Sequence, residues 1–130
     1  MKRNRNPAVH QWAEATYRQD HWLLSSVTVG EIRNGLLQLP GGNERTRLEL
    51  QFEFLLRSRF YDRIVPVTRQ IAERWAIFTA WRRSAGRPLS VIDGYVAATA
   101  HELGLQVVTR NVKDFQDLGL TIVNPFEFER

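Results

Sequence analysis

The last third of the chain alternates helical and strand patterns, and this alternation constrains the fold more than any other feature of the sequence. Residues 91–103 carry apolar side chains at helical spacing and stop at Gly104, while residues 105–109 and 120–123 are short apolar runs around a short helical segment at 113–118. Apolar strands that alternate with helices are typical of a parallel sheet covered on both faces. We therefore predict an α/β fold.

The first two thirds of the chain fit the same fold class. Apolar spacing predicts four helices, at residues 7–18, 29–39, 48–59 and 68–85. Strands are predicted at residues 22–26 and 64–67, the second of them buried. With 130 residues and 43% apolar content, the chain is expected to form a single domain.

The helix predicted at residues 68–85 has one apolar stripe, and four residues are expected to face inward along it: Ile71, Trp75, Phe78 and Trp81. Near its end lie Arg82, Arg83 and Arg87. We interpret these arginines either as RNA contacts or as a solvated helix end.

Composition excludes several classes of function. The chain has no cysteine, so it can contain neither disulfides, nor thiolate metal sites, nor a cysteine nucleophile. No apolar run approaches the roughly 20 residues that span a bilayer, and the basic start lacks the apolar segment of a signal peptide, so we expect a cytoplasmic protein without a membrane partner. The 18 Lys and Arg residues exceed the 14 Asp and Glu residues, which favours a polyanionic partner, although many small basic proteins bind no nucleic acid.

Three predicted helix starts, at residues 28–31, 90–93 and 111–114, each have a capping residue followed by an acid three positions later. One explanation is the capping box, in which two side chains satisfy free backbone N–H groups and the acid favours the helix dipole. The other explanation is a metal site. In a parallel sheet these starts lie at one edge, where up to three carboxylates would converge and repel one another unless a cation such as Mg²⁺ or Mn²⁺ lay between them.

Asp93 is the acid for which the two explanations are most evenly matched. It lies at the edge of the apolar stripe of its helix, next to Ala97 and Ala100, where little side-chain bulk stands above it. Asp is also a poorer capping-box partner than Glu or Gln. Asp93 is therefore a candidate ligand as well as a candidate cap.

Four segments together resemble the PIN-domain ribonucleases, and within them the VapC/FitB-like toxins of type II toxin–antitoxin pairs. These segments are LSSVTVGEIRNG at residues 24–35, DGYVAATA at 93–100, VTRNVKDF at 108–115 and NPFE at 124–127. The resemblance extends in order and spacing from residue 6 to residue 129, which implies a single PIN-like domain over residues 1–130.

The resemblance implies an endoribonuclease that depends on Mg²⁺ or Mn²⁺, with a metal-activated water attacking an RNA phosphodiester. Glu31 and Asp93 match two of the family's acids, Asn111 falls where relatives have Asp or Asn, and Asp114 is a nearby acid that can act through water. These four residues are our candidates for the catalytic and metal-binding roles. The family also implies a cognate antitoxin protein and a toxin homodimer.

The sequence departs from the family pattern at its start. Relatives begin with an apolar strand that ends in an acid, and no equivalent segment precedes the first predicted helix. That strand would be central in the sheet and would supply a principal metal ligand. The departure is compatible with a chain start placed too late, with a degenerate copy, or with a fold completed by another chain. It also leaves an alternative function open, that of a catalytically silent binding protein which keeps the antitoxin and dimer surfaces.

Overall fold

The computed structural model describes residues 22–127, so the helix predicted at residues 7–18 lies outside the described residues. Its elements are, in order, β1 (Leu24–Ser25), α2 (Ser26–Leu37), α3 (Asn43–Arg59), β2 (Ile64–Val65), α4 (Arg69–Ser84), α5 (Val91–Leu103), β3 (Val107–Val108), the 3₁₀ helix η2 (Val112–Phe115), β4 (Ile122–Val123) and the 3₁₀ helix η3 (Pro125–Glu127). No helix within this range is long and apolar enough to cross a membrane.

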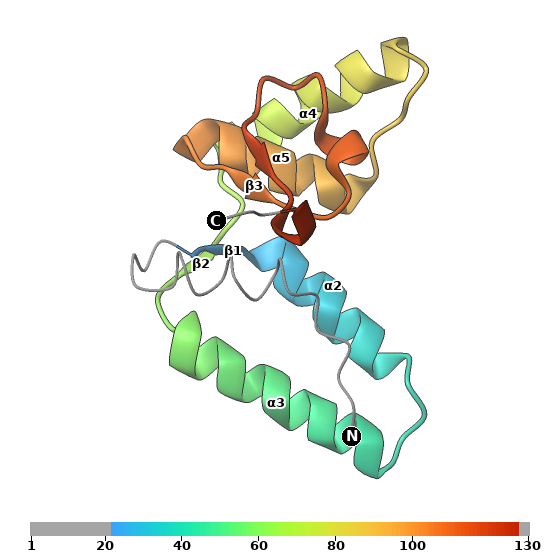
Figure 1. Ribbon diagram of the computed structural model, residues 1–130, viewed down its shortest axis with the longest axis vertical. Helices are drawn as coiled ribbons and strands as arrows, with labels where there is room; N and C mark the ends of the chain where they lie inside the picture. Colours follow the sequence, from blue (N-terminus) through green and yellow to red (C-terminus); the bar gives the residue numbers. More distant parts are fainter. Residues whose placement is uncertain (1–21, 128–130) are drawn as a thin grey trace.

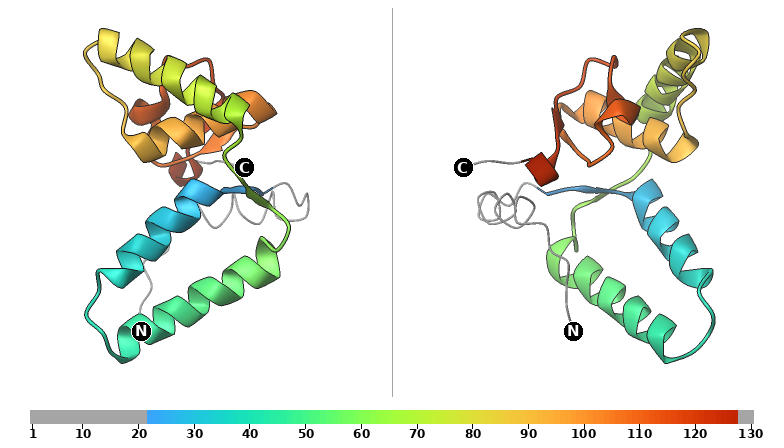
Figure 2. Two further views of the ribbon diagram at one scale, coloured as in Figure 1. Left: turned by 180° about the vertical axis from the view of Figure 1, so that it is seen from behind. Right: turned by 45° about the vertical axis from the view of Figure 1, so that its right-hand side comes forward.

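The elements are arranged in two lobes (Figure 1). Helices α4 and α5 form one lobe together with β3, β4 and η2, whereas α2 and α3 form a helical hairpin that projects away from it. Strands β1 and β2 lie where the two lobes meet, and the view from behind and the obliquely turned view show the same arrangement (Figure 2). The candidate site residues of α5 and η2 therefore belong to the first lobe, and Glu31 belongs to the hairpin.

The predicted parallel pairing of strands is confirmed. β1 pairs with β2 and β3 pairs with β4, both in parallel. The described residues form two separate two-stranded sheets and not one continuous sheet. Such a short pair has little stability of its own, so each depends on the helices that pack against it.

The strand predicted at residues 64–67 is shorter than expected and is not buried. β2 covers two residues, and Ile64 is more than a third exposed, as is Val108 in β3. A parallel strand is normally covered by neighbouring strands and by helices on both faces. Within the described residues each strand has one neighbour, which explains the exposure.

Helix α5 has the predicted bounds because local side-chain chemistry sets both of its ends. At the start, the Ser90 Oγ accepts a hydrogen bond from the backbone N–H of Asp93 at 3.1 Å. At the end, Gly104 takes a left-handed conformation with φ of 65°, which glycine adopts without the strain that a side chain would add.

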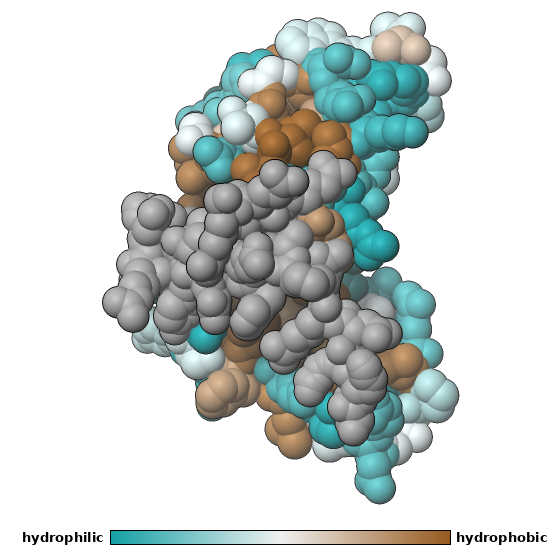
Figure 3. Space-filling view, in the orientation of Figure 1, coloured by the Kyte–Doolittle hydropathy of each residue, from teal (hydrophilic) through white to brown (hydrophobic). Residues whose placement is uncertain are grey.

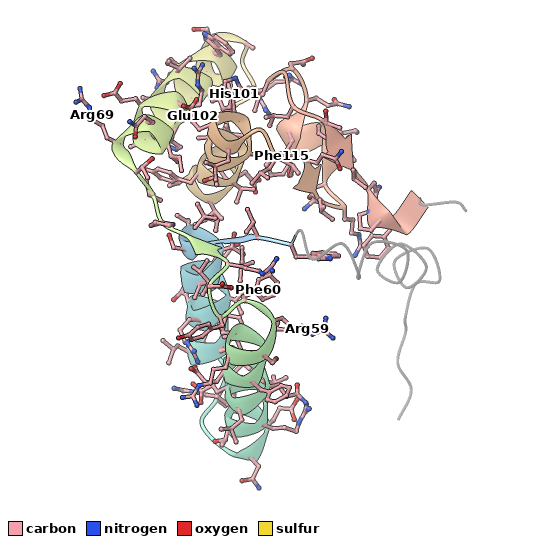
Figure 4. All side chains as sticks on the ribbon, turned by 90° about the vertical axis from the view of Figure 1, so that its left-hand side faces the viewer. Arg59, Phe60, Arg69, His101, Glu102 and Phe115 are labelled. Carbon is pink, nitrogen blue, oxygen red and sulfur yellow. The ribbon has the colours of Figure 1, made fainter. Side chains whose placement is uncertain are left out.

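The core lies in the first lobe, where α5 packs on α4. Small residues of α5, among them Ala97 and Ala100, let the two helices approach closely, and Phe78 of α4 is fully buried against them. Phe115 reaches from η2 into this core (Figure 4). Apolar side chains gather in the middle of this lobe and hydrophilic ones surround them on its outer rim (Figure 3).

One inward-facing residue of α4 was wrongly predicted. Trp81 is 54% exposed, whereas Arg82 is 6% exposed. Steps of four, three and four residues from Ile71 lead through Trp75 and Phe78 to Arg82, and this sequence of steps keeps a constant face of an α-helix toward the core. The arginine therefore continues the buried stripe, and the tryptophan lies beside it.

Gly94 provides a test of the packing between α4 and α5. A Cβ at this position would lie 2.7 Å from Cδ1 and 2.8 Å from Nε1 of Trp75, whose ring stacks on Tyr95. We expect Gly94→Ala to lower the free energy of unfolding by about 1–3 kcal/mol, because the helices must separate or the indole must move. Urea unfolding measures this change.

The matched control is Gly30→Ala in α2, where a Cβ would meet nothing within 4 Å. That variant is expected to gain roughly 0.5–1 kcal/mol from the better helix propensity of alanine. Equal effects of the two substitutions would contradict the close approach at Gly94.

Candidate functional site

Asp93 lies in the first turn of α5, and its carboxyl group is half-buried. Burial raises the pKa of this carboxyl above its ordinary value, and the charge of Asp114 raises it further. A hydrogen bond with the Ser90 side chain and the charge of Arg82 act in the opposite direction without cancelling the effect. The Asp93 carboxylate is therefore partly desolvated and lies within range of the negative charge of Asp114, and a bound cation would relieve both conditions.

Asp114 lies in η2, and backbone contacts hold it in place. Its N–H donates to the carbonyl of Asn111 at 3.1 Å, and its carbonyl accepts from Nη1 of Arg82 at 2.9 Å. The carboxylate itself is exposed and is close enough to Asp93 to influence its pKa. The structure thus brings two of the four predicted site residues together.

Asn111 immediately precedes η2 and is exposed. Its backbone N–H donates to the Thr109 Oγ1 at 3.0 Å, but its side chain makes no capping hydrogen bond to η2. The capping role predicted for Asn111 is therefore wrong. Its carboxamide makes no hydrogen bond to the start of η2, and Asn111 lies three residues after the end of β3.

Glu31 is placed differently from the sequence prediction. The Ser25 Oγ accepts from the Val27 N–H at 3.1 Å, so α2 begins at Ser26, three residues earlier than predicted. Thr28 and Glu31 then lie inside the helix, and the capping box predicted for them is wrong. The Glu31 side chain is exposed on α2, a helix that contacts α5.

The three predicted junctions thus differ. At residues 90–93 the Ser90 hydroxyl acts as the cap, so the Asp93 carboxylate is not required for that purpose. Within residues 22–127 no three His, Cys, Asp or Glu side chains form a group that could hold a metal ion, so the expected convergence of three carboxylates is absent there. Two carboxylates with a nearby amide oxygen still suit Mg²⁺, which binds through one or two carboxylates and completes its shell with water and phosphate oxygens.

Arg82 has a role in this region that was not predicted from the sequence. Its buried side chain donates from Nε to the carbonyl of Arg87 and from Nη1 to the carbonyl of Asp114, both at 2.9 Å. It is neither a solvated helix end nor available to RNA. The spacing from Ile71 and Phe78 is the sequence signal that could have revealed its burial.

Basic side chains near the acids differ in what they contact. Arg33, on α2, pairs with Glu53 of α3 at 3.1 Å and lies over the Phe52 ring, so it holds the hairpin together. Arg110, beside Asn111, is exposed and lies over the Phe126 ring with 4.8 Å to the ring centroid. The stacking leaves the edge of the Arg110 guanidinium free to meet an anion.

The fold is that of an α/β protein with parallel strand pairs, in which Asp93 and Asp114 lie in the first turns of α5 and η2. Residues 2–119 match the family model described as the PIN domain. The chain therefore belongs to the PIN domain family, as the resemblance of its sequence motifs predicted.

Similar proteins include a VapC ribonuclease and a FitB toxin. The chain is 33% identical over 120 residues to VapC ribonuclease Y4jK of Sinorhizobium fredii, covering 92% of this chain and 85% of the relative. It is 30% identical over 121 residues to Toxin FitB of Neisseria gonorrhoeae, covering 93% and 86% of the two chains. It is also similar to a chain in the solved structure of FitAB bound to an IR36 DNA fragment, with a TM-score of 0.87 and 28% identity over 99% of this chain and 90% of that chain.

The raised pKa of Asp93 predicts the pH dependence of Asp93→Asn in the absence of divalent metal. A carboxyl whose pKa is higher in the folded chain than in the unfolded chain favours folding when protonated, and this advantage is lost as the pH rises through the folded pKa. We therefore expect the free energy of unfolding at neutral pH to be higher for the variant than for the unsubstituted chain. The difference should shrink toward about pH 4, near the ordinary pKa of Asp.

Urea unfolding of Asp93→Asn and of the unsubstituted chain, from about pH 4 to neutral pH, measures the difference between their free energies of unfolding. The titration of all other groups is common to both chains and cancels in this difference. If the variant were the less stable at neutral pH, the helix-dipole contribution of Asp93 would dominate, and the raised pKa would be contradicted. Asp114→Asn is the companion variant, because it removes the like charge and should lower the pKa of Asp93.

Proposed function

We propose that the protein is a divalent-metal-dependent endoribonuclease and the toxin of a toxin–antitoxin pair. Membership of the PIN domain family and the similarity to VapC ribonuclease Y4jK support this proposal. The observation that carries it is the half-buried Asp93 carboxylate facing the charge of Asp114, an arrangement that is unfavourable without a cation.

Asp93 and Asp114 would hold the metal directly or through water, with the Asn111 amide oxygen beside them and Glu31 approaching from α2. Their oxygen donors suit Mg²⁺ or Mn²⁺. When bound, such an ion lowers the pKa of a water molecule and stabilises the negative charge that develops on a phosphodiester.

The protein's own residues fix the site and the substrate. The Ser90 cap sets the position of Asp93 at the first turn of α5, and the hydrogen bonds of η2 set that of Asp114. Arg110 and Lys113, which flank Asn111 in sequence, are exposed and would contact the RNA backbone next to the acids. Positive charge at this point draws a phosphate toward two carboxylates that would otherwise repel it.

The proposed partners follow from the relatives. Solved neighbours include FitAB bound to a DNA fragment and VapBC-5, which is described as a member of the VapBC family of toxin–antitoxin systems. We therefore infer that this chain binds a cognate antitoxin protein, acts in the cytoplasm, and forms a homodimer.

A catalytically silent binding protein is the second candidate. It is favoured by the absence, within the described residues, of a group of three acidic or histidine side chains that could hold a metal. In this case the Asp93 carboxylate would contribute only its favourable charge at the N-terminal end of α5, and the surfaces that meet the antitoxin would be the functional part.

The two candidates predict different responses to Mn²⁺. If the first is correct, Mn²⁺ at 100 times its dissociation constant should stabilise the chain by about 2.7 kcal/mol, and Asp93→Asn should remove this gain. Metal-dependent cleavage of single-stranded RNA should fall to background in the same variant. Thermal unfolding with and without Mn²⁺, together with a cleavage assay, measures both effects.

Glu73→Gln is the control, since this exposed carboxylate pairs with Arg69 on the surface of α4. It should leave the response to Mn²⁺ and the cleavage unchanged. A cooperative melt that ignores Mn²⁺, with no cleavage, would refute the nuclease and favour the silent binding protein. A response lost equally in Asp93→Asn and Glu73→Gln would show that Mn²⁺ acts as a nonspecific counterion.

The proposed RNA contact of Arg110 gives a separate prediction. Each phosphate contact on a single strand contributes about 0.7 to the slope of log affinity against log salt concentration. Arg110→Gln should therefore weaken RNA binding and reduce this slope by about 0.7. Arg69→Gln, an exposed arginine of α4 that pairs with Glu73, should leave the slope unchanged, and equal slopes in both variants would contradict the contact.

A further inference from the structure

Arg82 is a charged residue that is buried in the lobe formed by α4 and α5. Its side chain continues the buried stripe of α4, and no carboxylate of the described residues lies within ion-pair distance of it. A buried charge is unfavourable unless hydrogen bonds replace the water it has lost. The two backbone carbonyls that it contacts are therefore central to its role.

These two carbonyls belong to different segments of the chain. Nε of Arg82 donates to the carbonyl of Arg87, in the loop that leads into α5, and Nη1 donates to the carbonyl of Asp114, in η2. The first segment ends in the turn that carries Asp93, and the second contains Asp114 itself. Because the guanidinium is rigid and planar, it fixes these two acceptors relative to each other.

A second connection joins the same two segments at the surface. The Arg87 guanidinium pairs with the Asp117 carboxylate just after η2, and both side chains are exposed. The backbone N–H of Arg87 also donates to the carbonyl of Arg82 at 3.0 Å, which holds the loop against the end of α4. Exposed ion pairs contribute little to stability, so the buried guanidinium of Arg82 is the stronger connection between the two segments.

We infer that Arg82 is a positioning residue that sets the separation of Asp93 and Asp114 from beneath the site. This inference rests on the proposed function, in which these two acids hold the metal. In this view α4, which contributes no proposed metal ligand, determines how precisely the two acids are placed.

The separation can be measured without a metal. Since the chain has no cysteine, cysteines placed at the exposed positions of Val91 and Gln116 are unique sites for spin labels. We expect Arg82→Lys to broaden or shift the distance distribution between the labels, because one ammonium group cannot reproduce the planar fork. The control is Arg83→Lys, an exposed neighbour on the same helix, which should leave the distribution unchanged.

A second readout is the affinity for Mn²⁺. Arg82→Lys is expected to weaken Mn²⁺ binding by about tenfold or more, because the loss of a group that orients metal ligands typically lowers metal affinity by this amount. Asp117→Asn removes the surface connection and should change the affinity much less. Arg82→Gln removes the fork and the charge together, so it should change both measurements in the same direction as Arg82→Lys.

Each result decides the inference. An unchanged distance distribution in a folded Arg82→Lys chain would overturn it, whatever the chain does with Mn²⁺. A broadened distribution in a chain that binds no Mn²⁺ even without substitution would support the positioning role and refute the proposed function. Loss of cooperative unfolding in both Arg82→Lys and Arg82→Gln, with Arg83→Lys intact, would also overturn it, because Arg82 would then be required for the core and not for the site.

Discussion

The close packing of α5 on α4 is the contact on which the rest of the structure depends. Gly94, Ala97 and Ala100 leave so little bulk on α5 that Trp75 and Phe78 of α4 lie directly against it. The same helix carries Asp93 in its first turn, so the helix that forms the core also places the candidate ligand. With strands of two residues, the sheets could not hold the site in place by themselves.

The candidate site shows how function and stability oppose each other in this chain. A half-buried Asp93 beside the charge of Asp114 is unfavourable in the folded protein, which is why its pKa is raised. Placing the charged Arg82 in the apolar stripe beneath is unfavourable as well, unless its hydrogen bonds are made. Both features are understandable if the site is built to receive a cation and an anionic substrate and not to stabilise the apo protein.

Local chemistry made part of the structure predictable. The Ser90 cap and the left-handed Gly104 set the two ends of α5 through residues next to those ends. The family motifs around Asp93 and Asn111 were sufficient to predict the PIN domain. The start of α2 was missed because Ser25 and Thr28 can both cap a helix, and in the structure Ser25, which ends β1 beside β2, acts as the cap. The same ambiguity placed Glu31 at a helix start in the prediction and in a helix interior in the structure.

The sequence by itself determined the fold class, the bounds of α5 and the identity of the candidate acids, because each depends on residues a few positions apart. The tertiary structure decided which acids meet. Asp93 and Asp114 approach each other because η2 folds back on α5 and Arg82 contacts the carbonyls of both segments. The burial of Arg82 instead of Trp81 was also decided there. The helical spacing from Ile71 and Phe78 is compatible with a buried Arg82, but residue type favours the tryptophan, and packing against α5 selected the arginine.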